Sequence, residues 1–220
     1  MRRIDEPELL DEHDAPRRDV ERSLRDLQRI NRFLGGIRTY RKLIVRAAPD
    51  RAAPLRIVDL GAGTADCLES LADYPKLTPI AIDFNIIHLR YRQAGSRVHR
   101  VVADATRLPL RDGAVDLVTS AHFFHHFTPD ENVAILRDAL RAARRGVIVN
   151  DTRRHRLPLL FVQLLCALRL FGRITRSDAP ASVRRGYTDD EAGEIGRKVN
   201  PSTVDTTRIW PFRFGLFLWK

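Results

Sequence analysis

Three histidines stand close together in the middle of the chain, at His122, His125 and His126. A neutral imidazole is a suitable base for a phenol or another hydroxyl, because its ordinary pKa of about 6.5 leaves it able to accept a proton near neutral pH. Asp151 ends the next apolar run, where its carboxylate could orient one of these rings, although it could equally cap the segment that follows. The group predicts general-base chemistry.

The same histidines have the i, i+3, i+4 spacing that can place three imidazoles on one face of a helix to bind Zn²⁺. No matching carboxylate or cysteine is evident beside them, so we expect no metal site and a structural role for His122. The remaining histidines stand in charged or helical surroundings and are expected at the surface: His13, His88, His99 and His155.

A glycine-rich segment, VDLGAGTAD (58–66), could supply a ligand-binding loop. Gly61 and Gly63 end an apolar run, where bare backbone can approach a ligand and a following helix offers free N–H groups. A dinucleotide-binding loop would have a third glycine where this chain has Asp66, whose carboxylate would repel a pyrophosphate. The segment therefore predicts a ligand without phosphates and disfavours an NAD-type oxidoreductase.

Two further carboxylates follow apolar runs. Asp83 comes twenty positions after Gly63, where a carboxylate can accept both hydroxyl groups of a ribose. Asp104 follows the next run and, taken alone, could be a turn or cap residue. Acidic residues at three successive strand ends, starting with Asp59, indicate one shared site.

The hydrophobic pattern predicts the elements that must position these residues. Short β-rich runs alternate with helical periodicity, which implies parallel βαβ units in a three-layer αβα sandwich. Strands are expected at 55–60, 78–84, 97–104, 114–121 and 144–151. Helices are expected at 65–72, 85–93, 129–143 and 188–199, the last with a Thr-Asp-Asp-Glu capping signature. The end of the chain, 202–220, reads as an antiparallel pair turning near Pro211.

Two segments fall outside this alternation. Residues 1–50 are expected to form a helical cap, with amphipathic helices over 19–45 broken near Gly35 and Gly36, ahead of a main domain over 51–220. An insert at about 153–186 contains the apolar stretch 157–171, flanked by arginines. We expect this stretch to cover the acceptor pocket, and its rival interpretation is a helix lying on anionic lipid.

Composition limits the classes of partner. The net charge is +10, but only four of the 38 basic residues are lysines and no nucleic-acid-binding motif is present, so nucleic-acid binding is disfavoured. Two cysteines make a disulfide framework improbable and fit a reducing cytoplasm. The polar N-terminus lacks the apolar core of a signal peptide, and no apolar run is long enough to cross a bilayer.

Four segments together resemble the motifs of class I S-adenosylmethionine-dependent methyltransferases: VDLGAGTAD (58–66), IAIDF (80–84), VVADATRLPL (101–110) and VDLVTSAHFFHHF (115–127). The resemblance covers roughly residues 55–151 and implies a seven-stranded, mostly parallel Rossmann-like sheet in the order 3-2-1-4-5-7-6 with an antiparallel last strand. It implies S-adenosylmethionine as cofactor and S-adenosylhomocysteine as product. The implied cofactor residues are Asp59, Gly61, Gly63, Asp83, Phe84, Asp104, Ala105 and Ser120.

In that family the first loop holds the methionine part, Asp83 would hold the ribose hydroxyls, and Asp104 with the backbone of Ala105 would meet the adenine edge. Small-molecule O-methyltransferases of this kind carry His-His or Glu-His at the position of His125 and His126, and the resemblance favours His125 as base, assisted by His126 and Asp151. The implied activity is methylation of a hydroxyl, expected to be phenolic, on an apolar small molecule. The alternatives are C-methylation, or an RNA or protein methyltransferase that docks its polymer through the basic surface; the sequence leaves the oligomeric state open.

Overall fold

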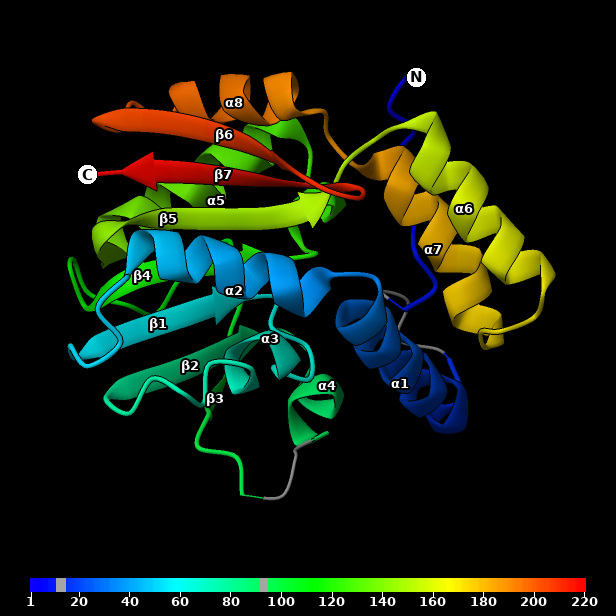
Figure 1. The fold of residues 1–220 in the computed structure, drawn as a ribbon, viewed down its shortest axis with the longest axis horizontal. Helices are drawn as coiled ribbons and strands as arrows, with labels where there is room; N and C mark the ends of the chain where they lie inside the picture. The colour runs from blue at the N-terminus through cyan, green and yellow to red at the C-terminus, as the bar shows by residue number, and fades with distance from the viewer. Residues whose placement is uncertain (11–14, 92–94) are drawn as a thin grey trace.

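The computed structural model describes residues 1–10, 15–91 and 95–220, so the surface prediction for His13 and residues 92–93 of the predicted helix 85–93 lie outside the described part. Seven strands form one sheet in the order β3-β2-β1-β4-β5-β7-β6, with β7 antiparallel to both neighbours, as expected (Figure 1). The strands are β1 (Leu55–Leu60), β2 (Leu77–Asp83), β3 (His99–Val102), β4 (Val115–Ala121), β5 (Ala143–Thr152), β6 (Thr203–Ile209) and β7 (Arg213–Trp219).

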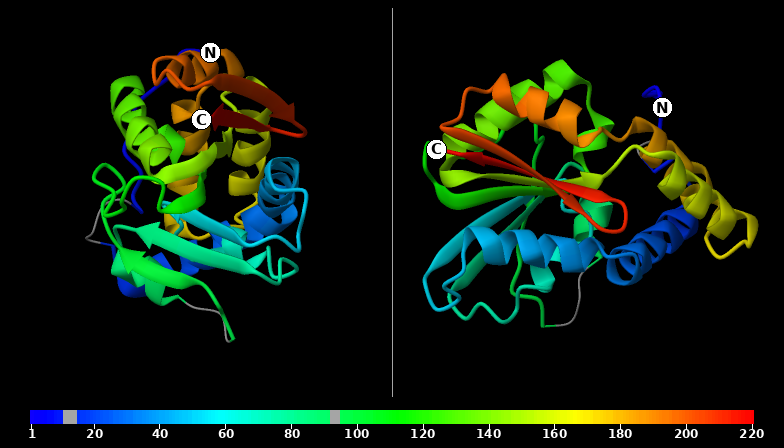
Figure 2. Two further views of the ribbon diagram at one scale, coloured as in Figure 1. Left: turned by 90° about the vertical axis from the view of Figure 1, so that its left-hand side faces the viewer. Right: turned by 45° about the horizontal axis from the view of Figure 1, so that its top comes forward.

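Helices cover both faces of this sheet, which completes the predicted three layers (Figure 2). The described helices are α1 (Arg17–Phe33), α2 (Gly36–Ala47), α3 (Asp66–Glu69), α4 (Ile86–Arg90), the 3-10 turn η1 (Phe124–His126), α5 (Pro129–Ala142), α6 (Arg156–Ala167), α7 (Arg173–Arg185) and α8 (Asp189–Arg197). Thr188 and Glu191 form the expected capping box of α8.

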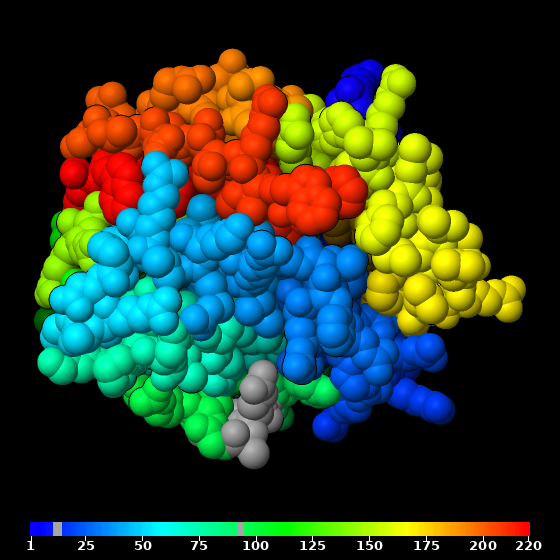
Figure 3. Space-filling view, viewed as in Figure 1, coloured from blue at the N-terminus to red at the C-terminus, as the bar shows by residue number. Residues whose placement is uncertain are grey.

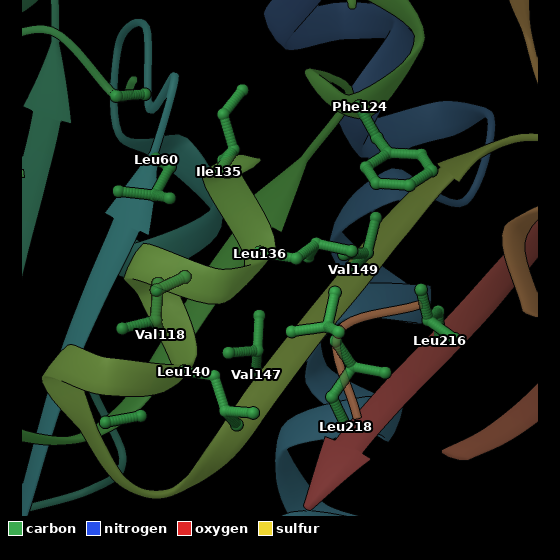
Figure 4. Packing of buried hydrophobic residues seen from close by; sticks show 14 of the residues in the cluster. Leu60, Val118, Phe124, Ile135, Leu136, Leu140, Val147, Val149, Leu216 and Leu218 are labelled. Carbon is green, nitrogen blue, oxygen red and sulfur yellow. The ribbon is translucent and has the colours of Figure 1, made fainter. Parts of the chain in front are cut away.

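The two faces of the sheet build two separate cores because strand side chains alternate between faces. Val118 and Val149 pack against α5 and α8, with Leu136 and Leu140 of α5 pointing toward β5 (Figure 4). On the opposite face, the fully buried Ile57 packs with residues of α2 and α3. This double covering holds the strand ends rigidly, and the candidate site lies at those ends.

The predicted cap segment, residues 1–50, divides in space. Gly35 adopts a left-handed φ of 84° and separates α1 from α2 at the predicted break. Helix α2 buries Tyr40 and Ile44 against the sheet, so it belongs to the sandwich. Helix α1 instead lies with α6 and α7 at one end of the molecule (Figure 1). No helix in the described part of the chain is both long and apolar enough to cross a membrane.

Candidate active site

A cavity of about 490 Å³ opens at the carboxyl ends of β1, β2 and β4. Its floor is made by the loop after β1, the ends of β2 and β3, and the β4–α5 connection. Its roof is made by Glu8 and Leu10 of the N-terminal arm (residues 1–10), together with residues of α1 and α7. The cavity thus lies where ligands bind in open α/β sheets.

The β1 loop needs glycine at Gly61 for two reasons. Its φ is +64°, and a Cβ there would overlap the ring of Phe123. Gly63 also has a positive φ, +53°, but no atom lies within 4 Å of where its Cβ would be, so its backbone borders the open cavity. The two glycines therefore shape the loop and leave room for a ligand beside it.

Asp83 connects the ends of β1 and β2. Its Oδ2 accepts the N–H of Gly63 and its Oδ1 the N–H of Asn85, both at 2.8 Å. The imidazole of His88 lies 3.6 Å from Oδ1 and lines the cavity with 13% of its side chain exposed, so the prediction that His88 is a surface residue was wrong. Its position follows from α4, whose single turn folds back beside the end of β2.

Carboxylates gather around the loop. Burial and the charges of Asp66 and Asp83 raise the pKa of Asp59 to about 7, although the hydroxyl of Thr119 donates to it at 2.7 Å. Burial likewise raises the pKa of Asp66, which accepts a hydrogen bond from the amide of Asn31 of α1 at 3.1 Å. A cationic ligand would relieve this repulsion, whereas a phosphate would add to it.

The remaining predicted cofactor residues are placed unequally. Phe84, Asp104 and Ala105 line the cavity, with Phe84 66% exposed. Asp104 also closes a turn, in which its carboxylate accepts the N–H and the hydroxyl of Thr106, both at 2.8 Å. Asp104 is therefore both a turn residue and a residue of the cavity lining. Ser120 does not line the cavity: it is buried on β4, and the next residue, Ala121, is the one that lines it.

The histidines lie in a short connection, not on a helix face. His122 has a left-handed φ of 57° and donates its N–H to the carbonyl of Asn150 at 2.9 Å, and η1 follows directly. Thr128 then caps α5 with a capping box to Glu131. The chain is fixed on both sides, so the orientation of the imidazoles is fixed as well. Burial and the charge of Arg213 lower the pKa of His122 well below its ordinary value and keep that ring neutral.

His125 and Asp151 form a buried pair. The ring Nδ1 of His125 lies 2.8 Å and 3.0 Å from the two carboxylate oxygens of Asp151, and the backbone N–H of His125 donates to Oδ2 at 3.0 Å. The adjacent strands β4 and β5 deliver these residues to one place. The expected contact between Asp151 and one of the histidine rings is present, and Nε2 of His125 faces the cavity roof.

Glu8 stands on the other side of that ring. Its Oε1 lies 3.3 Å from Nε2 of His125, and its Oε2 lies 3.9 Å from Nε2 of His126. Ser182 of α7 donates its hydroxyl to Glu8 at 2.8 Å. His125 therefore lies between two carboxylates, and no sequence pattern near Glu8 indicated this contact across 117 positions.

The two carboxylates change the protonation of His125. Burial alone would lower its pKa, but the charge and hydrogen bond of Asp151, with those of Glu8, raise it to about 10. Burial would raise the pKa of Asp151, yet the charge of His125 holds it far below its ordinary range. With Glu8 in place the ring is an imidazolium, in contrast to the neutral base expected from the sequence.

The N-terminal arm is tied down over the site. Asp178 of α7 accepts the N–H groups of Leu9 and Leu10 at 2.9 Å and 3.0 Å. The guanidinium of Arg3 donates to the carbonyls of His125 and Phe127 at 3.1 Å and 3.0 Å. The arm and α7 therefore close the cavity above the histidines.

The insert covers the cavity with α7, not with its apolar stretch. Among the described residues, Thr175, Asp178, Ala179 and Ser182 of the insert line the cavity, and none of 157–171 does. The expectation that 157–171 covers the pocket was wrong because α6 packs on α7, one layer farther out.

Glu8, His125 and His126 could also be considered as cation ligands, since their ligand atoms all lie within 4.8 Å of one another. Arg185 lies 4.0 Å from Glu8, however, and the protonated His125 supplies a second positive charge. This carboxylate is already neutralised by protein cations, so the cluster does not favour a metal ion.

Comparisons with known proteins agree with this geometry. A family model described as a methyltransferase domain matches residues 57–146. A malonyl-[acyl-carrier protein] O-methyltransferase of Geobacter sulfurreducens is 34% identical over 74% of this chain, which spans 55% of that relative's length. A demethylmenaquinone methyltransferase of Roseiflexus castenholzii is 31% identical, with 73% of each chain covered. The chain belongs to the class I S-adenosylmethionine-dependent methyltransferases.

A solved structure supports the fold of this methyltransferase. The plantazolicin methyltransferase BpumL, crystallised with S-adenosylhomocysteine, superposes with a TM-score of 0.70 at 11% identity, covering 90% of this chain and 89% of that one. Here the floor of the cavity suits S-adenosylmethionine, the cofactor of this enzyme family. Its amino and sulfonium groups are cations, which fits the carboxylates Asp59, Asp66 and Asp83 around the loop.

The methyltransferase site also contains residues that the sequence did not indicate as ligand contacts. Asn31 and His88 reach the floor of the cavity from α1 and α4, and Glu8 and Asp178 reach its roof. Only His88 lay close to a motif, four residues after IAIDF. The others come from segments that long-range packing alone brings to the site.

Proposed function

We propose that this methyltransferase transfers a methyl group to a hydroxyl, expected to be phenolic, on an apolar small molecule. The observation that carries the proposal is the buried His125–Asp151 pair, which faces the same cavity as the cofactor loop and offers Nε2 to a ligand there. The cavity is roofed by the arm, α1 and α7, which suits a small molecule better than a polymer. Methylation of RNA or protein is therefore not favoured.

The roof and the β4–α5 connection give the acceptor an apolar surface. The apolar residues of α1 and of this connection that line the cavity are Leu24, Leu27, Ile30, Phe123 and Phe127. The ring centroids of Phe123 and Phe127 lie 4.8 Å apart, and these rings would contact a planar acceptor by stacking or edge-to-face packing. An aromatic acceptor with one hydroxyl directed at the histidines matches this lining.

The chain's residues would act on the proton of the acceptor hydroxyl. S-adenosylmethionine, when bound, supplies a methyl group on a positively charged sulfur. As the new carbon–oxygen bond forms and the carbon–sulfur bond breaks, the hydroxyl proton passes to Nε2 of His125, with the carboxylate of Asp151 stabilising the resulting imidazolium. His126, whose ring centroid lies 4.4 Å from that of His125, would help to hold the hydroxyl.

Glu8 must leave Nε2 for this step to occur. An acceptor hydroxyl that takes the place of the Glu8 carboxylate removes one of the two charges that raise the pKa of His125. The ring then becomes able to lose its proton and serve as base. Acceptor binding and activation of the base are thereby one event.

Isotope-labelled cofactor tests the proposal and its alternative together. The enzyme is incubated with ¹³C-methyl-labelled S-adenosylmethionine and a panel of apolar phenols, and the chemical shift of the transferred carbon identifies its bond. A methoxy signal supports O-methylation, whereas a methyl signal on ring carbon gives C-methylation. One relative is named as an O-methyltransferase and another as a demethylmenaquinone methyltransferase. Their names do not decide the atom that this chain methylates, whereas the chemical shift does.

A further inference from the structure

Helix α6 leaves its apolar side chains in solvent. Residues 157–168 contain no charged side chain. Four leucines on the helix and its end are more than half exposed: Leu157 at 60%, Leu160 at 62%, Leu164 at 57% and Leu168 at 61%. Together with Phe161 they form the surface called here the α6 face. A contiguous apolar surface of this kind marks a site of interaction, because soluble monomers rarely expose one.

The α6 face lies at the end of the molecule that carries the cap. Helix α6 packs on α7, α7 packs on α1, and both α7 and α1 line the cavity (Figure 1). In the space-filling view α6 projects from the body of the protein beside α1 and the β6–β7 turn (Figure 3). That turn holds Trp210, 85% exposed, and Phe212, whose ring lies 5.9 Å from that of Phe161.

Positive charge is concentrated at the same end. The arm (residues 1–10), helix α1 and residues 156–185 together contain fourteen arginines and seven acidic residues, a net charge of +7 out of +10 for the whole chain. Arg156 and Arg169 lie at the two ends of α6, and Arg173 begins α7; all three are exposed. Helices that lie in the interface of an anionic bilayer have this composition: leucine, phenylalanine and tryptophan on one face, bordered by arginine.

We propose that the α6 face is a docking surface for an anionic lipid bilayer. Docking would bring the end of the molecule that carries α1 and α7, the roof of the cavity, close to the lipid. An amphiphilic acceptor dissolved in the bilayer could then reach the site without crossing water. This last step rests on the proposed function, whereas docking itself does not.

Charge also argues against a second copy of the chain as the occupant. In a two-fold symmetric contact through α6, the same surface faces itself, so the arginines at the ends of one helix would meet those of the other. Like charges brought together in this way oppose association. An anionic lipid surface meets both the leucines and the arginines favourably.

Flotation with vesicles of phosphatidylcholine and phosphatidylglycerol tests the docking. We expect binding to vesicles rich in phosphatidylglycerol, little to phosphatidylcholine alone, and weakening with salt. The double variant Leu160→Ser/Leu164→Ser should bind about tenfold more weakly or worse, because the two side chains no longer enter the lipid. Val102→Ser, at an exposed position on the edge strand β3, serves as the control and should bind like the wild type.

A second pair of variants tests the charge. Arg169→Gln/Arg173→Gln should lose roughly tenfold in affinity, while Arg56→Gln/Arg137→Gln, exposed positions on β1 and α5 with the same change in total charge, should lose much less. Thermal melting and cofactor binding verify that each variant is folded. Vesicle binding that is unchanged in the leucine variant overturns the proposal, and so does a concentration-dependent dimer that this variant abolishes.

These measurements do not involve turnover, so docking can fail while methyl transfer succeeds, and the reverse. If docking holds, the initial rate on an acceptor carried in anionic vesicles should fall about tenfold in the leucine variant, as binding does. The rate on a short-chain, water-soluble acceptor should be unchanged, because neither leucine lines the cavity.

Discussion

The floor and the roof of the cavity are built in different ways. On the floor, Asp83 bonds to Gly63 and Asn85, which are twenty and two residues away and lie at the ends of buried strands. On the roof, Glu8 meets His125, and Asp178 holds Leu9 across 169 positions. The floor is a consequence of the sheet, whereas the roof depends on an arm that reaches the site from the end of the chain.

This difference predicts where the site opens. Most residues of β1 and β4 beneath the floor are almost completely buried, whereas the arm is held partly by half-exposed ion pairs such as Glu6 with Arg184 at 3.2 Å. Exposed pairs of this kind contribute little to stability. We therefore expect the arm to detach locally while the floor stays formed, which gives the acceptor its way in.

The largest effect is expected where roof and floor meet. His125→Ala and Asp151→Asn should each lower kcat by about 10²–10⁴-fold, because the base or its supporting charge is lost. Calorimetry should find cofactor affinity nearly unchanged, since neither side chain bonds to the β1 loop. His99→Ala, an exposed histidine of β3, is the control. Wild-type turnover in both variants would place the base elsewhere.

A substitution on the floor should instead weaken cofactor binding. Asp83→Ala removes a carboxylate that would bind the ribose and also orders Gly63, so cofactor affinity should fall by about 5–150-fold, the equivalent of 1–3 kcal/mol. Asp112→Ala makes the same charge change at a side chain that is 81% exposed and should leave affinity intact. Equal affinities for the two variants would remove Asp83 from the cofactor site.

The same contrast explains what the sequence could predict. The strand order and the cofactor motif follow from local pattern, because alternating hydrophobicity places Asp59, Asp83 and Asp104 at neighbouring strand ends. On β4 the structure brings Ala121, not the neighbouring Ser120, to the cavity lining, because side chains alternate along a strand. Residues on the floor are thus predictable to within one step of the strand.

The roof was not predictable in this way. The apolar stretch 157–171 was expected to cover the cavity because it follows the fifth strand, whose carboxyl end lies at that edge of the sheet, yet α7, a more polar helix, lies over the cavity and leaves α6 outside. Glu8 belongs to an acidic segment in which no residue is distinguished by pattern. Its role, and with it the protonation of His125, depends on contacts made only in the folded chain.

Stability should report the protonation of His125. Its pKa in the folded protein, about 10, lies above its ordinary value, so the stabilisation is complete below about pH 6.5 and is lost as pH rises toward 10. The free energy of unfolding should therefore fall between pH 7 and pH 10 by up to about 1 kcal/mol per pH unit. When the free energy of unfolding is measured by urea denaturation at several pH values, Asp151→Asn should show a smaller decrease with pH than the wild type, because the carboxylate that holds the proton is gone. If the two proteins lose stability equally with pH, the buried ion pair is contradicted.

The smallest effect separates the arm's charge from its structure. Glu8→Gln keeps the shape of the side chain but removes one of the carboxylates that raise the pKa of His125, so the ring should lose its proton at lower pH. The acidic limb of the kcat/KM profile, which reports the free enzyme with Glu8 still beside Nε2, should then move downward by about one pH unit, a roughly tenfold change in rate on that limb. Glu6→Gln makes the same substitution two residues away, where the side chain is 46% exposed and pairs with Arg184, so its limb should stay in place.

If both variants shift the limb equally, the net charge of the arm and not the contact between Glu8 and His125 sets the pH dependence. If neither does, Glu8 does not hold the proton on His125 in the free enzyme, and the arm closes the roof without controlling the base.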